Sequence, residues 1–324
     1  MHVFIDTNIL LNFFHFTKDE LSALGDVFAS HERGAAKVHL TVQVRDEFRR
    51  NREKKISDAL KKYKETVRSV QFPSFMKPYE QYTEIRSLSN KMQAASKELL
   101  EKLNEDISTK SLHADQLISK IFEESDFSSL PEEYYARAKA RMDMGNPPGK
   151  NGSIGDAINW LILLDKVPET EDLHIISEDG DFYSILDDSK AHPFLIEEWK
   201  EKKNSELHTY RTLDSFLKAR FDGIEFSYDS KKEELIDDLK CSGSFATTHY
   251  LIGKLEQFSY YSLSEVERIL EAALENGQFG GIVTDYDVSD FLNRVAAPHL
   301  DRLRKKEHKE IIKDVIEEKS GRNE

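Results

Sequence analysis

The sequence contains a single cysteine, Cys241, among its 324 residues. One cysteine excludes an internal disulfide framework and a zinc site built from several thiolates, and it suits a reducing compartment. The chain also lacks any run of about 18 apolar residues, so no membrane span is expected. Its short apolar opening lacks the basic segment of a signal peptide and is interrupted by Asp6, Asn8 and His15. These absences predict a cytoplasmic protein.

An overall positive charge is also missing, because the net charge is −14. This argues against a protein that coats nucleic acid, since non-specific affinity for phosphates comes from Lys and Arg. Residues 33–68, however, contain 12 Lys and Arg against 5 Asp and Glu, a local charge of +7. Arg45, Arg49 and Arg50 in this segment are therefore candidates for contacts with substrate phosphates. The alternative is an ordinary solvated helix face.

Apolar residues make up 39% of the chain, which is enough for a buried core. Strand and helix patterns alternate up to about residue 221, which predicts an α/β domain with a parallel sheet flanked by helices. A mostly helical insertion is expected at about residues 70–146. Residues 222–324 show helix patterns with little strand signal, and they predict a separate helical module that could carry a protein-partner site.

Four acidic residues stand where strands end or helices begin. Asp6 follows the strand pattern VFI, and Asp179 lies just beyond the strand pattern in LHIISEDGDF. Glu47 lies in a helix that comes after a short strand, and Asp156 lies in the first turn of the helix GDAINW. Because open α/β sheets bind ligands at the carboxyl ends of their strands, we expect the four carboxylates to meet at one edge.

Clustered carboxylates without a His or Cys set predict a site for Mg²⁺ or Mn²⁺, which can support phosphodiester hydrolysis. Asp6, Asp156 and Asp179 are the expected ligands, and Glu47 is a ligand or orients the attacking water. Asp181 is a further candidate ligand. Asn8 and Ser177 are expected to hold the ligand carboxylates in place. Taken singly, each acid could instead be a turn former or a helix cap.

The order of these motifs resembles the PIN-domain nucleases, whose pattern is strand-D-T-N, a helix Glu, an Asp at a helix start and strand-(S/T)-x-D-x-D-F. The resemblance covers roughly residues 1–220. The segment NPPGKNGSIGDAINW is similar to a bacterial branch with PPGxK ahead of GDAxxW, and Lys150 in it is a candidate phosphate contact. The residues that match the family motifs are Asp6, Asn8, Glu47, Asp156, Ser177, Asp179, Asp181 and Phe182.

The resemblance implies a metal-dependent endonuclease, usually acting on RNA and leaving a 5′-phosphate. We expect an endoribonuclease that acts as a toxin or an antiviral effector, with nucleic acid as its partner and RNA favoured over DNA. A structure-specific DNA nuclease and a catalytically idle binding module are the alternatives. A phosphatase of the haloacid type would need a second Asp where Asn8 stands.

Overall fold

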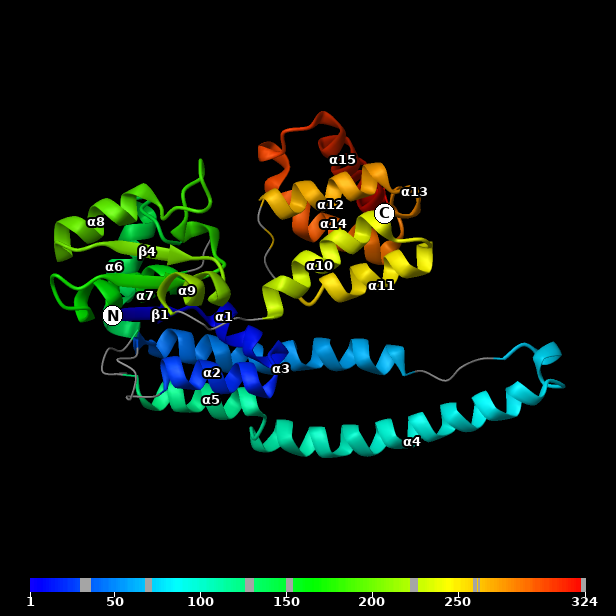
Figure 1. Ribbon diagram of the computed structural model, residues 1–324. Coiled ribbons are helices and arrows are strands. Elements are labelled where there is room, and N and C mark those ends of the chain that lie inside the picture. Colours follow the sequence, from blue (N-terminus) through cyan, green and yellow to red (C-terminus); the bar gives the residue numbers. More distant parts are fainter. Residues whose placement is uncertain are drawn as a thin grey trace. The chain divides into compact units, whose positions relative to one another are not determined.

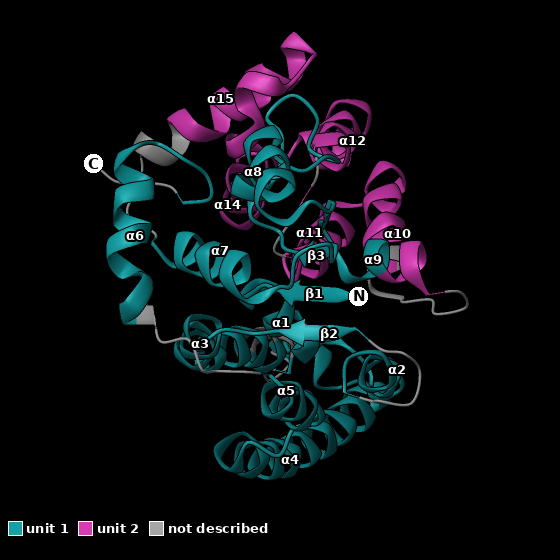
Figure 2. Cartoon of the chain, turned by 90° about the vertical axis from the view of Figure 1, so that its left-hand side faces the viewer, with its two compact units in different colours: residues 1–216 teal, residues 217–324 magenta. Residues whose placement is uncertain are grey.

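The structure is a computed structural model, and it describes residues 1–29, 36–67, 72–125, 131–149, 154–221, 227–258, 261 and 263–321. Its contacts divide the chain into two compact units, residues 1–216 and 217–324 (Figure 2). The first unit is an α/β fold (Figure 1), as the strand and helix patterns predict. The second unit is helical throughout its described part.

The first unit is built on a parallel four-stranded sheet in the order β2-β1-β3-β4. All four residues of β1 and of β3 are buried, which explains why these strands are continuous apolar runs, as is usual in parallel sheets covered on both faces. The register pairs Ile5 with Ile176, so the two central strands end side by side. The strands are β1 (His2–Ile5), β2 (Lys37–His39), β3 (Leu173–Ile176) and β4 (Leu207–Tyr210).

Helices surround this sheet. The first unit contains α1 (Thr7–Asn12), α2 (Lys18–Phe28), α3 (Val42–Thr66), α4 (Glu80–Thr109), α5 (His113–Glu123), α6 (Pro131–Asp143), α7 (Gly155–Lys166) and α8 (Pro193–Lys203), with short 3-10 turns η1 (Phe13–His15), η3 (Ser74–Met76) and η4 (Gly180–Phe182). A further helix, α9 (Leu213–Arg220), crosses the boundary between the units.

The central helix of the first unit is α7. Nine of its residues are buried, and it packs against α3, α6 and α8. Trp160 of α7 and Trp199 of α8 contact each other with ring centroids 5.7 Å apart, and both are fully buried. Because α7 carries Asp156 in its first turn, this packing fixes one of the predicted acids on a rigid element.

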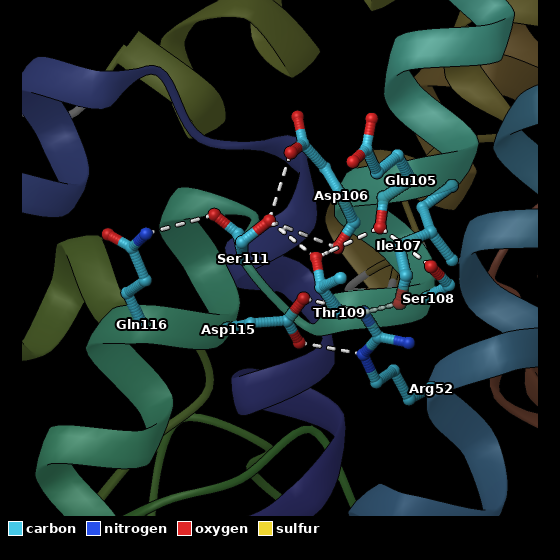
Figure 3. Close-up of polar contacts among 9 residues, drawn as sticks. All are labelled: Arg52, Glu105, Asp106, Ile107, Ser108, Thr109, Ser111, Asp115 and Gln116. Atoms are coloured by element: carbon cyan, nitrogen blue, oxygen red, sulfur yellow. Dashed lines mark hydrogen bonds and ion pairs between the residues drawn. The ribbon is translucent and has the colours of Figure 1, made fainter.

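A long helical hairpin is formed by α3 and α4 (Figure 1). The two helices are antiparallel, since the Tyr63 hydroxyl of α3 bonds Ser96 Oγ of α4 at 3.0 Å and Arg52 of α3 donates to the Ile107 carbonyl at 3.1 Å. At the base of the hairpin, Arg52 also forms a buried ion pair with Asp115 of α5, with bonds of 2.7 and 2.5 Å (Figure 3). Helices therefore occupy the predicted insertion, but the hairpin starts within α3, which runs on to Thr66.

The second unit contains α10 (Ser227–Cys241), α11 (Phe245–Leu255), α12 (Leu263–Glu275), α13 (Gly277–Gly280), α14 (Tyr286–Ala296), η5 (Ala297–Arg302) and α15 (Lys306–Gly321). It has a core of its own, built from apolar residues between Ile236 and Val315. A buried ion pair joins Lys232 of α10 to Glu265 of α12 at 2.7 Å. Within the described residues, no helix is long and apolar enough to cross a membrane.

Candidate active site

Asp6 lies where β1 ends and α1 begins, and it is 4% exposed. Its backbone N–H continues the ladder to the Ile176 carbonyl at 3.0 Å, which brings it beside Ser177 at the end of β3. The Ser177 hydroxyl donates to Asp6 Oδ2 at 2.5 Å, and the Thr7 backbone N–H donates to Oδ1 at 2.6 Å. Both oxygens of the first predicted acid are thus fixed by neighbouring groups.

The turn after β3 places the next two acids. Ser177 Oγ accepts a bond from the Asp179 backbone N–H at 3.0 Å, and Asp179 Oδ1 accepts one from the Asp181 N–H at 2.8 Å. These bonds form a compact side-chain-capped turn that leads into η4. Asp181 Oδ2 in turn accepts a bond from the Gly149 N–H at 3.0 Å, so the loop between α6 and α7 reaches this turn.

Glu47 of α3 is held between α1 and α7. The Thr7 hydroxyl donates to its Oε2 at 3.1 Å, and Gln43 Nε2 donates to its Oε1 at 2.5 Å. A Cβ built at Gly155, the first residue of α7, would lie 2.5 Å from that same Oε1. Glycine at this position therefore lets the start of α7, with Asp156, approach Glu47 without displacing the end of that side chain.

The carboxylates at this sheet edge influence one another's protonation. Burial raises the pKa of Asp6 to about 7, against the hydrogen bonds from Ser177 and Thr7, and the charges of Asp179 and Glu47 add to the increase. Burial also raises the pKa of Asp156 to about 8, together with repulsion from its acidic neighbours, which are Asp6, Asp179, Glu47 and Asp181. All five predicted acids thus share one electrostatic site.

The part of the chain that the structure describes contains no group of three or more His, Cys, Asp or Glu side chains already arranged to hold a metal ion. The chemistry of the donor set nevertheless fits a hard divalent cation. Five carboxylates converge on one edge, and burial and mutual repulsion raise the pKa of Asp6 to about 7 and that of Asp156 to about 8. A cation with oxygen preference would relieve both effects.

The remaining predicted site residues lie in different surroundings. Asn8 is exposed, and the contacts to Asp6 come from Ser177 and Thr7 instead. Arg45 and Arg49 line a hollow between α3 and α5 that also includes Phe48 and Phe122. Arg50 is exposed. Lys150 lies outside the described residues.

The hollow opens on a different side of α3 from Glu47, because Arg45 and Arg49 each lie two positions from Glu47 and residues at that spacing are separated by about 200° around an α-helix. Arg50, three residues after Glu47, projects from the same side as that acid. Among the described residues that were predicted to contact phosphates, Arg50 therefore lies on the same side of α3 as the carboxylates.

Three contributors were not identified from the sequence: Thr7, Gln43 and Gly155. Thr7 is the middle residue of the D-T-N motif, so the motif itself contained the signal. Gln43 lies one helical turn before Glu47, a spacing at which side chains meet. Gly155 immediately precedes Asp156, but only the packing of α7 against α3 shows that a Cβ there would displace neighbouring side chains.

Comparison with known proteins agrees with this geometry. Searches among curated proteins and among solved structures returned no match. A family model described as PIN domain matches residues 3–182, a range that begins in β1 and ends at the last residue of η4. All five carboxylates lie inside the matched range, which covers more than half of the chain, and the protein therefore belongs to the PIN domain family of nucleases.

Proposed function

We propose that this protein is an endoribonuclease that depends on Mg²⁺ or Mn²⁺. The observation that supports the proposal is the convergence of Asp6, Glu47, Asp156, Asp179 and Asp181 at the carboxyl edge of the sheet. The other four acids raise the pKa of Asp156, and Asp179 and Glu47 also raise the pKa of Asp6. Membership of a nuclease family makes nucleic acid the substrate class. The choice of RNA rests on the usual substrate of that family.

Asp6, Asp156 and Asp179 would hold the cation, with Asp181 as a further ligand. A bound divalent cation supplies charge neutralisation at the phosphate and a water of lowered pKa. Ser177 and the Thr7 N–H keep Asp6 in a fixed orientation, which reduces the reorganisation needed on binding. Glu47, which accepts bonds from Thr7 and Gln43, would orient the attacking water and accept its proton.

A cleavage assay tests this function. The protein is incubated with end-labelled single-stranded RNA, the DNA of the same sequence and the corresponding duplexes, with Mn²⁺ or with EDTA. We expect cleavage of RNA in Mn²⁺, none in EDTA, and a 5′-phosphate on the product. Cleavage of DNA but not of RNA would contradict the RNA assignment and favour a structure-specific DNA nuclease.

The variant Asp6→Asn tests the site itself. It keeps the shape of the side chain but removes the charge, so cleavage should fall at least about 100-fold. Ser177→Ala should lower the rate by about tenfold or more, because it removes the bond that orients Asp6. Asp143→Asn, on the exposed end of α6, is the matched control. A fully active Asp6→Asn protein would rule out this carboxylate cluster as the catalytic centre.

We further propose that the enzyme acts as a toxin or an antiviral effector, and that the helical unit 217–324 selects the substrate or binds a protein partner. Two features support a role in substrate selection. The helical unit has a core of its own, and α3, which carries Glu47, continues into the hairpin with α4. Expression of the wild type should arrest cell growth, and Asp6→Asn should relieve the arrest. Growth unaffected by the wild type would contradict the toxin role.

A further inference from the structure

The segment NPPGKNGSIGDAINW contains two structural parts, a Pro-Gly loop at its start and the first turns of α7. The cluster of acids uses only Asp156 from it. The structure nevertheless ties the loop tightly to the helices around it through Arg141, at the end of α6. Arg141 is 5% exposed, and its Nε donates to the Pro147 carbonyl at 2.7 Å. This bond fixes the loop at its first proline.

The same guanidinium forms a bidentate ion pair with Glu198 of α8, with bonds of 2.8 and 2.5 Å. Glu198 Oε2 also accepts a bond from Trp160 Nε1 at 2.8 Å. Trp160 lies one helical turn after Asp156 on α7. Burial raises the pKa of Glu198, but the bonds from Arg141 and Trp160 outweigh it, and the pKa falls below its ordinary value. Glu198 therefore stays charged and joins α6, α7 and α8.

The loop ends at the acidic cluster. Gly149 adopts a φ of 126°, a backbone conformation that favours glycine, and in it the N–H points to Asp181 Oδ2 at 3.0 Å. Only Pro148 thus separates Pro147, whose carbonyl Arg141 holds, from Gly149, whose N–H holds Asp181. A planar guanidinium with several donors can bridge a carbonyl and a carboxylate at once, whereas an ammonium acts as a single point charge.

We propose that Arg141 and Glu198 form a positioning clamp: by holding the Pro147–Gly149 loop, they place the Gly149 N–H on Asp181 and so fix this carboxylate for metal binding. Arg141 is a positioning residue, since it acts through Gly149. The inference rests on the proposed metal-dependent function, because it assigns a role to a carboxylate of that site. It explains why the Pro-Gly loop and Trp160 accompany Asp156 in one segment.

The chain offers a matched control one turn away on α6. Arg137 also makes two bonds to a carboxylate, Asp165 of α7, at 2.7 and 3.3 Å. It joins α6 to α7, but its hydrogen bonds within the described residues go to Asp165 and not to the loop. Comparing Arg141→Lys with Arg137→Lys therefore separates the loss of an inter-helix ion pair from the loss of the loop contact.

The test measures Mn²⁺ binding to the full chain by titration calorimetry, together with kcat and KM for RNA. Arg141→Lys should weaken Mn²⁺ binding by about tenfold and lower kcat with little change in KM, and Arg137→Lys should do neither. Gly149→Ala is the second variant, because it disturbs the loop but leaves the Arg141–Glu198 pair intact. It should weaken Mn²⁺ binding to a similar extent.

The proposal is overturned if both Arg141→Lys and Gly149→Ala bind Mn²⁺ within twofold of the wild type. If Arg141→Lys does not fold, Gly149→Ala alone decides in the same way. Wild-type protein that binds Mn²⁺ but cleaves no nucleic acid would contradict the proposed function and leave the clamp supported by the binding data. Wild-type protein that binds no Mn²⁺ would overturn both.

Discussion

A Cβ at Gly155 would displace the ends of two side chains, because it would lie 2.5 Å from Glu47 Oε1 and 2.8 Å from Gln43 Nε2. We expect Gly155→Ala to push Glu47 out of position and lower kcat by about tenfold or more while the fold is retained. Gly25→Ala in α2 is the control. Its Cβ would meet only Leu117 at an ordinary 3.5 Å, so it should raise stability by about 0.5–1 kcal/mol without affecting cleavage. Equal activity of the two variants would show that the contact is not needed.

The raised pKa values of Asp6 and Asp156 predict a pH dependence of stability in metal-free protein. In the folded state these carboxyls keep their protons up to about pH 7 and about pH 8, whereas in the unfolded chain they lose them near 3.8. Between these limits the folded state binds more protons, so the free energy of unfolding should decrease as the pH rises.

Denaturant unfolding in EDTA between pH 5 and pH 8 measures this effect. Asp6→Asn should flatten the dependence, because the amide does not titrate. Adding Mn²⁺ at pH 8 should raise the melting temperature of the wild type, since a ligand that binds only the folded state stabilises it. Stability that is constant across this pH range in EDTA would mean that the two carboxyls titrate normally.

At the scale of elements, what the sequence predicts correctly is local. An apolar strand with an acid at or just beyond its end predicts β1 with Asp6 and β3 with Asp179, and the parallel sheet brings the two strand ends together. The bond between Gly149 and Asp181 and the pair between Arg141 and Glu198 could not be predicted, because they join residues 32 and 57 positions apart through the packing of α6, α7 and α8. Hydrophobic periodicity carries no information about such partners.

The basic face of α3 is the element whose role is most directly testable. Reversing Arg50 to Glu should weaken RNA binding and reduce the slope of log affinity against log salt by about one unit per lost phosphate contact. Arg49→Glu makes the same test on the side of α3 that lines the hollow against α5. Lys139→Glu on α6 makes the same charge change at another exposed position. If the slope of log affinity against log salt is unchanged in both α3 variants, these arginines belong to an ordinary solvated helix face and do not contact phosphates.

At the scale of the whole molecule, the second unit is expected to fold without the first. Its core cluster is built from residues between Ile236 and Val315, all within that unit. A chain ending at residue 221 keeps all of α9, whose Phe216 stacks on Phe28 and contacts His174 of β3.

We therefore predict that residues 1–221 are soluble, bind Mn²⁺ and cleave RNA with less selectivity than the full chain. Size-exclusion chromatography and a comparison of cleavage products across several RNAs check this. Aggregation of the shortened protein would contradict separability of the two units. Cleavage of the same sites with the same preference as the full chain would contradict the role of residues 217–324 in substrate choice.

The pairing of β1 with β3 also sets the time at which the enzyme can become active during its own synthesis. Ser177, which orients Asp6, is synthesised 171 residues after it. At typical synthesis rates this interval is roughly 10 to 30 s. Until then the nascent chain lacks β3 together with Ser177, Asp179 and Asp181, so under the proposed function it should not cleave RNA, including the message from which it is being translated.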